Sequence, residues 1–509
     1  MRHLLLLAVA LLVGRAEAQT TVTSSAPDRV SLTVYRAPYG RGAMTLQYLG
    51  GFALVTETRR VRLPRGPAVL RFEGVAQGIV PVSAVIDGLP GGTIEKNRDA
   101  RLLSPASLVD GTLGRDVTLT RTDRATGRPT SEPATVVAGP APGVILRTVT
   151  GIEALRCSGL AERLAFAGVP GGLSSKPVLS VTTISPAART VTVRLSYLAS
   201  GFDWRASYVA ALAANGRTVD LFAWLTLANS NPEVFPKAEV QAVAGRLNRV
   251  ALPAVPAAAG GLRLVCYPLG TTTSDLPETE FEPADEIVVT ASRAMAPPAA
   301  DDGAPGTTPA AAPPEDLGDL KLYRIPTPTT VAARAQKQVA LLFQKGVPVD
   351  RRYRRAVYPG QQLDGVPTSI VLVMKNDTPG GLGVPMPAGS TALYAERAGG
   401  RLLLGLGAVT DRTVGETVRL AAGISSQVML TQAIVASRVP MAAPGEALSR
   451  EVVLTATNAN PFPATLDVPI GAAGQAIEAD DKALNRTDGI LTWSPTLPPG
   501  GRAILRYRY

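Results

Sequence analysis

The chain has 509 residues, a formal net charge of +10, two cysteines and one histidine. The histidine is His3, which lies in a predicted signal peptide, so we expect the mature protein to contain none. Without histidine, Ser-His-Asp and Cys-His catalytic systems and histidine-based zinc sites are excluded, and two cysteines cannot form a four-thiolate site. We therefore predict neither a cofactor nor a metal site.

Residues 1–18 have the features of a secretory signal peptide. Arg2 and His3 precede an apolar run, Leu4 to Val13, and the small residues Ala16 and Ala18 mark a cleavage site after Ala18. The apolar run is shorter than the roughly 20 residues needed to cross a bilayer. The sequence predicts a periplasmic or secreted protein with no transmembrane span.

Export changes the meaning of the charge and of the cysteines. Loss of Arg2, Arg15 and Glu17 lowers the formal net charge from +10 to +9. In an exported protein this charge favours an anionic glycan, a lipid or an envelope protein over nucleic acid, and the ordinary explanation is the basic surface of a protein from an arginine-rich proteome. Cys157 and Cys266 could form a disulfide in this compartment or remain as two buried thiols.

The first half of the mature chain reads as strands separated by turns. Residues 19–100 predict an N-terminal β-domain, with strands near 31–35, 52–63 and 68–72. Residues 101–170 hold shorter strands with tight turns, which suggest a small inserted β-barrel. In residues 171–269, alternation at 191–197 and 219–227 predicts the first part of a β-sandwich, with the second strand central in it.

The second half begins with a change of composition. Residues 270–320 are rich in proline and alanine and predict a flexible linker. Residues 321–509 return to strand-like patterns and predict the C-terminal part of the β-sandwich. The predicted fold class is mainly β: multi-domain antiparallel β-sandwiches with a small inserted β-barrel and a disordered Pro/Ala-rich linker.

The order of several short motifs resembles the domain of unknown function 4139 family, exported bacterial proteins related to the mucoidy-inhibitor group. The motifs that carry the resemblance are Leu32 to Tyr35, Gly51 to Val55, Leu63 to Gly66, Phe72 to Val75, Leu195 to Tyr208, Tyr323 to Pro326 and Pro387 to Gly389. Residues 36–50 and 270–320 depart from the family pattern as insertions. The resemblance implies an architecture and no established activity.

Two clusters are candidate ligand-binding sites. In the first, Trp204 and Arg205 follow a turn and could contact a ligand, because Trp and Arg are favoured at binding sites. The alternative is a β-arch in which Trp204 packs in the core and Asp203 caps the turn. The second cluster comprises Arg351, Arg352, Arg354 and Arg355. Its charge on both strand faces indicates an edge strand or exposed hairpin, which could bind phosphate or sugar acids.

A third candidate lies in the linker, where residues 285–293 resemble the TonB box of outer-membrane receptors. A β-prone run in a flexible tether is suited to pairing as an added strand with a TonB-type protein. The candidate partner-binding residues are Asp285, Glu286, Ile287, Val288 and Val289. The alternative is a valine-rich stretch that docks on the protein's own sheet.

Paired carboxylates could support glycoside hydrolysis without histidine. The candidates Glu278, Glu280, Asp480 and Asp481 lie in predicted loops, where solvated acids are the ordinary explanation. We therefore expect a non-catalytic, exported cell-envelope β-protein that acts as a binding or structural module. The alternatives are a partner of a TonB-type system and a carboxylate glycoside hydrolase.

Overall fold

The computed structural model describes residues 20–38, 44–99, 102–123, 125–139, 143–155, 162–171, 173–245, 247, 314–397, 400–435, 450–479, 481–487 and 489–509. Strands dominate these residues, which confirms the predicted mainly β, multi-domain fold. Among the residues described, no helix has the length and apolar character needed to cross a membrane.

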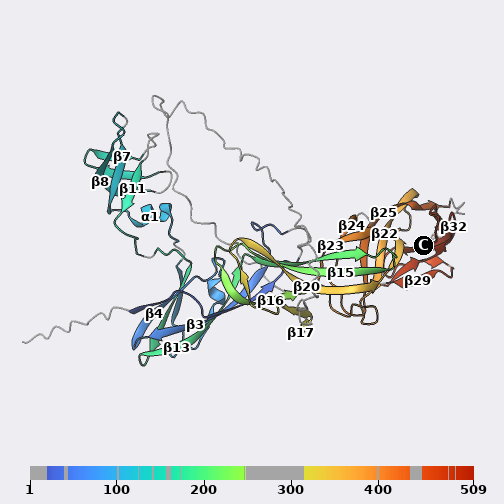
Figure 1. Cartoon of the computed structure of the whole chain (residues 1–509), viewed down its shortest axis with the longest axis horizontal. Coiled ribbons are helices and arrows are strands. Elements are labelled where there is room, and N and C mark those ends of the chain that lie inside the picture. Colours follow the sequence, from blue (N-terminus) through green and yellow to red (C-terminus); the bar gives the residue numbers. More distant parts are fainter. Residues whose placement is uncertain are drawn as a thin grey trace, which may run out of the picture.

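The N-terminal part is a sandwich of two sheets (Figure 1). The larger sheet contains β2 (Arg29–Tyr35), β3 (Phe52–Leu63), β5 (Val85–Asp87), β13 (Arg189–Ser200), β16 (Phe235–Ala244), β17 (Glu315–Leu317), β18 (Leu320–Arg324) and β19 (Thr329–Val331). The smaller sheet contains β1 (Thr20–Ser24), β4 (Gly66–Glu73), β6 (Glu95–Asp99) and β12 (Val178–Ser185). Alternate residues of each strand point inward, so that Val55 and Leu195 of one sheet share a core with Leu70 and Val181 of the other. The 3-10 turn η1 (Pro81–Ser83) precedes β5.

A small β-unit is inserted between β6 and β12. Its antiparallel sheet contains β7 (Asp116–Thr122), β8 (Pro129–Ala138), β9 (Ile145–Thr148), β10 (Gly151–Ala154) and β11 (Arg163–Phe166), in the order β10-β9-β8-β7-β11. The helix α1 (Pro105–Gly111) leads into it and begins with a capping box between Ser104 and Ser107. The unit has its own core, which includes Leu119 and Leu146, and it projects from the sandwich at the upper left of Figure 1.

A central sheet of long strands follows, in the order β20-β15-β14-β23-β24. The strands are β14 (Phe202–Leu212), β15 (Thr218–Asn229), β20 (Ala335–Pro348), β23 (Gly389–Arg397) and β24 (Gly400–Val409). The position of β15 between β20 and β14 confirms that the strand predicted at 219–227 is central.

In the described residues, the C-terminal part is one ten-stranded sheet with its own core. It contains β21 (Asp350–Arg354), β22 (Leu363–Lys375), β25 (Thr417–Ile434), β26 (Glu451–Asn458), β27 (Ala464–Ile470), β28 (Glu478–Ala479), β29 (Leu484–Thr487), β30 (Ile490–Trp493), β31 (Thr496–Leu497) and β32 (Arg502–Arg508). The strands β22 and β25 belong to two cores. Leu372 and Leu420 pack into the core shared with the central sheet, whereas Leu363 and Leu430 pack into the C-terminal core.

The units are interleaved along the chain, and the N-terminal sandwich extends beyond the predicted residues 19–100. The N-terminal sandwich takes strands from residues before 100 and also from 178–200, 235–244 and 315–331. The end of the predicted linker, 315–317, is β17. Among the strands described, four pairs are parallel: β1–β4, β2–β16, β14–β23 and β21–β27. The predicted signal peptide, linker residues 270–313, Cys157 and Cys266 lie outside the described residues.

Candidate functional site

The motif around Trp204 is a β-arch that carries the chain from one sheet to another. β13 ends at Ser200, Gly201 turns the chain with φ +82°, and β14 begins in the central sheet at Phe202. The Trp204 side chain is fully buried, and its Nε1 donates to the carbonyl oxygen of Val243 at 3.1 Å. The prediction that Trp204 contacts a ligand is therefore wrong, because its strand is packed on both sides, and the β-arch alternative describes the site.

Asp203 and Arg205 also serve this arch. The Asp203 Oδ1 accepts hydrogen bonds from the backbone N–H groups of Trp204 and Ala37, both at 2.9 Å. Arg205 is on the same face of β14 as Asp203, opposite to Trp204, and is partly buried, with its guanidinium 4.0 Å from the Asp203 carboxylate. Asp203 therefore joins β14 to the chain that follows β2, and Arg205 lies beside its carboxylate.

Arg36 and Asp411, which sequence reasoning missed, complete a junction around Trp204. The Arg36 guanidinium contacts both Asp411 carboxylate oxygens, at 2.6 and 2.5 Å, and lies 5.7 Å from the centre of the Trp204 ring. Asp411 also accepts from the Ala388 N–H at 2.9 Å. No local pattern marks Arg36 and Asp411, because only the folded chain brings them together. The junction connects the N-terminal sheet to the loop before β23.

Two tyrosines add hydrogen bonds to the same junction. The Tyr208 hydroxyl donates to the Pro387 carbonyl at 2.6 Å, and the Tyr323 hydroxyl donates to the Pro385 carbonyl at 3.2 Å. Burial raises the pKa of both phenols well above the usual value, so both remain protonated donors. The hydroxyls of Tyr208 and Tyr323 and the charges of Arg36 and Asp411 thus bind other groups of the protein, which favours a structural role for the junction.

The second predicted cluster lies on β21. Arg354 forms an ion pair with Asp467 at 2.5 Å, and Arg352 contacts Asp350 at 3.4 Å. Arg355 donates to the Pro367 carbonyl at 2.9 Å, and Arg351 is exposed. The strand pairs with β22 along its length and with β27 only at Tyr353 and Arg354. The strand is therefore a sheet edge only over residues 350–352. Two of the four arginines of the cluster, Arg352 and Arg354, are paired with acids.

A third arginine surface, also missed, lies on the outer face of the larger N-terminal sheet. Arg60 and Arg62 of β3, Arg194 of β13 and Arg29 of β2 are exposed on it. We call these four residues, with Thr58, Thr190 and Thr192, the arginine–threonine face. The alternation of Arg60 and Arg62 is visible in the sequence, but the register that adds Arg29 and Arg194 is not.

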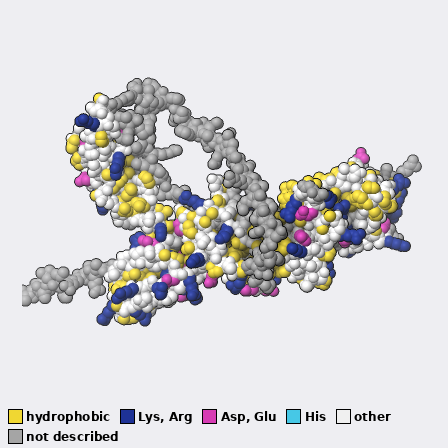
Figure 2. All heavy atoms as spheres, in the orientation of Figure 1, with side chains coloured by type: hydrophobic (Ala, Val, Ile, Leu, Met, Phe, Trp, Pro, Cys, Tyr) yellow, Lys and Arg dark blue, Asp and Glu magenta, His cyan; other side chains and the backbone are white. Residues whose placement is uncertain are grey.

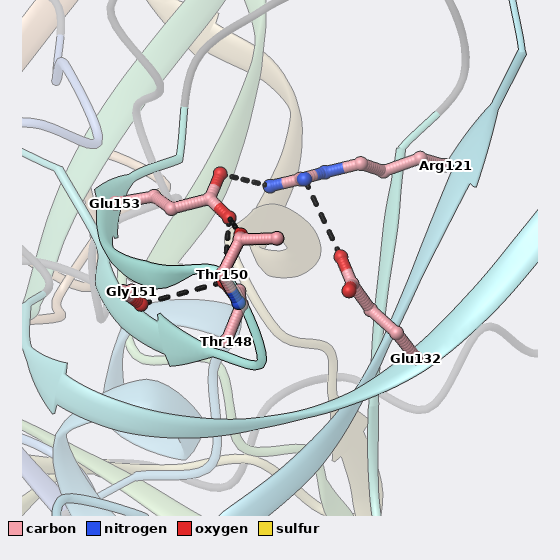
Figure 3. A network of polar contacts seen from close by, with 6 residues as sticks. All are labelled: Arg121, Glu132, Thr148, Thr150, Gly151 and Glu153. Atoms are coloured by element: carbon pink, nitrogen blue, oxygen red, sulfur yellow. Dashed lines mark hydrogen bonds and ion pairs between the residues drawn. The ribbon is translucent and has the colours of Figure 1, made fainter.

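The inserted unit contains a polar network centred on Arg121 (Figure 3). Its guanidinium contacts Glu153 at 2.7 Å and Glu132 at 3.3 Å. The Glu153 carboxylate also accepts from the Thr148 hydroxyl at 2.7 Å, and these contacts lower its pKa. Glu132 of β8 and Glu153 of β10 both contact Arg121 of β7, so the network connects these three strands.

One partly buried acid titrates near neutrality. Glu233 lies after β15, where its Oε2 accepts from the Gln77 N–H at 2.8 Å. Burial raises the pKa of Glu233 to about 7, against the opposing effects of Arg334 and Arg98. Glu233 joins the loop after β4 to the chain between β15 and β16.

The remaining predicted sites are mostly untested by the structure. Residues 285–293, Glu278, Glu280 and Asp480 lie outside the described residues. Asp481 accepts from the Ala483 N–H at 2.7 Å within a turn. In the described part of the chain, no three His, Cys, Asp or Glu side chains are grouped so that they could hold a metal ion.

Neither a scan of the sequence against protein-family models nor a search of curated proteins finds a match.

Proposed function

We propose that the protein is a non-catalytic binding or structural module of the cell envelope, exported to the periplasm or secreted, whose ligand is an anionic envelope polymer. The observation that carries this proposal is the placement of arginines on the outer faces of packed sheets. Strands such as β3 and β32 bury alternate apolar residues and expose arginines between them. A rigid sheet holds these charges at fixed spacings without a deep pocket.

A binding assay tests this proposal. Mature protein, from residue 19 onward, is titrated with polygalacturonate and with neutral dextran of similar length by isothermal titration calorimetry. We expect binding to polygalacturonate alone, with an affinity that falls as salt rises, because exposed charges are screened. Equal binding to dextran, or none to either polymer, contradicts the proposal.

We also propose that the chain is a distant member of the domain of unknown function 4139 family. Support comes from where the motifs of the resemblance meet. Tyr208 bonds to Pro387, Ala206 pairs with Gly389, and the Trp204 and Tyr323 rings lie 6.0 Å apart. Motifs that are distant in sequence thus share one junction, as expected if together they specify the fold.

A second candidate function is pairing with a TonB-type protein through residues 285–293. The observation in its favour is the sequence itself, with Ile287, Val288 and Val289 in a Pro-rich stretch. Deletion of 285–293 is expected to abolish binding to a TonB C-terminal domain, whereas deletion of the neighbouring residues 300–308 leaves it intact. Equal binding by both variants, or none by the full chain, rejects this candidate.

A further inference from the structure

We infer that the arginine–threonine face of the N-terminal sandwich is the surface that binds an extended acidic polysaccharide. The inference rests on the proposed function and gives it a location. In Figure 2, Lys and Arg side chains gather at the lower-left end of the molecule, over β3, β4 and β13. This surface is distinct from the two ligand-binding clusters predicted from the sequence, around Trp204 and on β21.

Strand register sets the geometry of the face. Thr192 lies opposite Arg60, and Thr190 lies opposite Arg62, on the paired strands β13 and β3. In the next row, Thr58 lies between Arg29 on one side and Arg194 on the other. Cross-strand partners point to the same side of a sheet, about 5 Å apart, and alternate residues of a strand are about 7 Å apart. The result is a grid in which each cross-strand row sets guanidinium groups beside hydroxyls.

The charges of the grid are largely available. Arg60 contacts Asp28 at 3.4 Å, in an exposed pair of little energetic consequence. Asp87 lies opposite Arg194 in the register. In the described part of the chain, Arg62 and Arg29 form no ion pair. Four guanidinium groups thus face two carboxylates, which leaves the grid positive.

The other two arginine surfaces hold closer ion pairs than the grid does. On β21, Arg354 is paired with Asp467 and Arg352 with Asp350. On β32, Arg506 is paired with Glu451 at 3.2 Å, and Arg508 lies opposite Glu451 and Glu478 in the register. Ile504, 48% exposed, interrupts the β32 row. The N-terminal grid is the best match to a repeating anion.

The composition of the grid selects the kind of polymer. Guanidinium groups bind carboxylates or phosphates in bidentate fashion, and threonine hydroxyls can exchange hydrogen bonds with sugar hydroxyls. The grid holds no aromatic side chain on which a nucleic-acid base could stack. It also holds no large apolar side chain that could enter a bilayer. An acidic polysaccharide satisfies both kinds of polar group.

Two triple variants with the same change of charge test the inference. One carries Arg60→Thr, Arg62→Thr and Arg194→Thr, and the matched control carries Arg502→Thr, Arg506→Thr and Arg508→Thr on β32. Threonine keeps the strand propensity of these exposed positions. Binding to polygalacturonate is measured by calorimetry at two salt concentrations, with duplex DNA and anionic lipid vesicles as competing ligands. Thermal melting monitors the fold of each variant.

We expect the N-terminal variant to lose at least tenfold in affinity and the β32 control less than threefold. Equal losses would show that net charge alone determines binding and would overturn the inference. If wild type binds and the N-terminal variant is unaffected, the inference fails while the proposed function stands; if wild type does not bind, both fail. Tighter binding of wild type to DNA or vesicles also overturns the inference.

A charge-preserving variant keeps the test decisive if the threonine variant unfolds. Arg60→Lys, Arg62→Lys and Arg194→Lys retain the charge and remove the planar, bidentate guanidinium. We expect a several-fold loss of affinity for polygalacturonate with an unchanged melting temperature. Wild-type affinity in this lysine variant would contradict recognition by the guanidinium grid.

Discussion

Neighbouring arginines on β3 have opposite roles because of strand alternation. Arg59 is fully buried, and its guanidinium contacts the Glu57 carboxylate and the carbonyl oxygens of Ser24 and Glu73, at 2.8, 2.9 and 2.9 Å. The Tyr197 hydroxyl donates to the other Glu57 oxygen at 2.8 Å. Burial raises the pKa of Glu57, and the Arg59 guanidinium and the Tyr197 hydroxyl oppose this rise by stabilising the charged carboxylate.

Replacing Arg59 should therefore be far more costly than replacing Arg60. Arg59→Ala leaves Glu57 buried without its cation, and we expect a loss of about 3–5 kcal/mol in the free energy of unfolding. Arg60→Ala removes only an exposed pair, and we expect a loss below about 1 kcal/mol. Urea denaturation of the two variants measures both values. Similar losses would contradict the assignment of Arg59 to the core.

Glu233 should make stability depend on pH. Its pKa is raised to about 7 in the folded protein, above the usual carboxyl value, so the folded state holds this proton more tightly than the unfolded state. The stabilisation is fully present below the unfolded pKa, near 4.5, and is lost as the pH rises through about 7. Stability should fall between these limits by about 1–3 kcal/mol from this group.

The variant Glu233→Gln separates this effect from other titrations. Glutamine keeps an acceptor for the Gln77 N–H and carries no charge. We expect the variant to be more stable than wild type at pH 8 and nearly equal at pH 5, as measured by thermal melting in parallel buffers. If the melting temperature of the variant changes between pH 5 and pH 8 as much as that of wild type, the pH dependence belongs to another group.

At the scale of elements, sequence alternation identified strands and faces but not their partners. Val193, Leu195 and Tyr197 face inward on β13 as predicted, since local alternation records which face is buried. The parallel pairing of β14 with β23 left no local signal, because it joins segments that are far apart in the chain. Trp204 was predictable as an arch residue because the turn beside it is visible in the local sequence. Its spatial neighbour Arg36 was not predictable, because it is distant in the chain.

The pairing of β14 with β23 depends on a glycine. A Cβ at Gly389 would lie 2.3 Å from the Ala206 carbonyl oxygen and 3.1 Å from its Cβ. We expect Gly389→Ala to destabilise the protein by roughly 1–3 kcal/mol, because the strands must separate. Gly168→Ala is the control, since a Cβ there meets nothing within 4 Å. Equal stability of the two variants, measured by chemical denaturation, would contradict this close approach.

At the scale of the whole molecule, the cores are coupled to different degrees. The paired strands β22 and β25 contribute side chains to both the central and C-terminal cores, so the same two strands belong to both units. The inserted unit differs, because β7 to β11 pair only with one another and enclose a separate core. We therefore expect the inserted unit to open without the rest of the molecule.

Leu119→Ala tests this independence. Leu119 is fully buried in the inserted core, and its truncation should lower the local free energy of unfolding by about 2–5 kcal/mol. Amide hydrogen exchange should then accelerate in β7, β8 and β9 and remain at wild-type rates in β3 and β13. The matched variant Leu195→Ala, in the sandwich core, should instead accelerate exchange in β3 and β13. If Leu119→Ala also accelerated exchange in β3, the inserted unit would be part of the same cooperative structure as the sandwich that carries the arginine–threonine face.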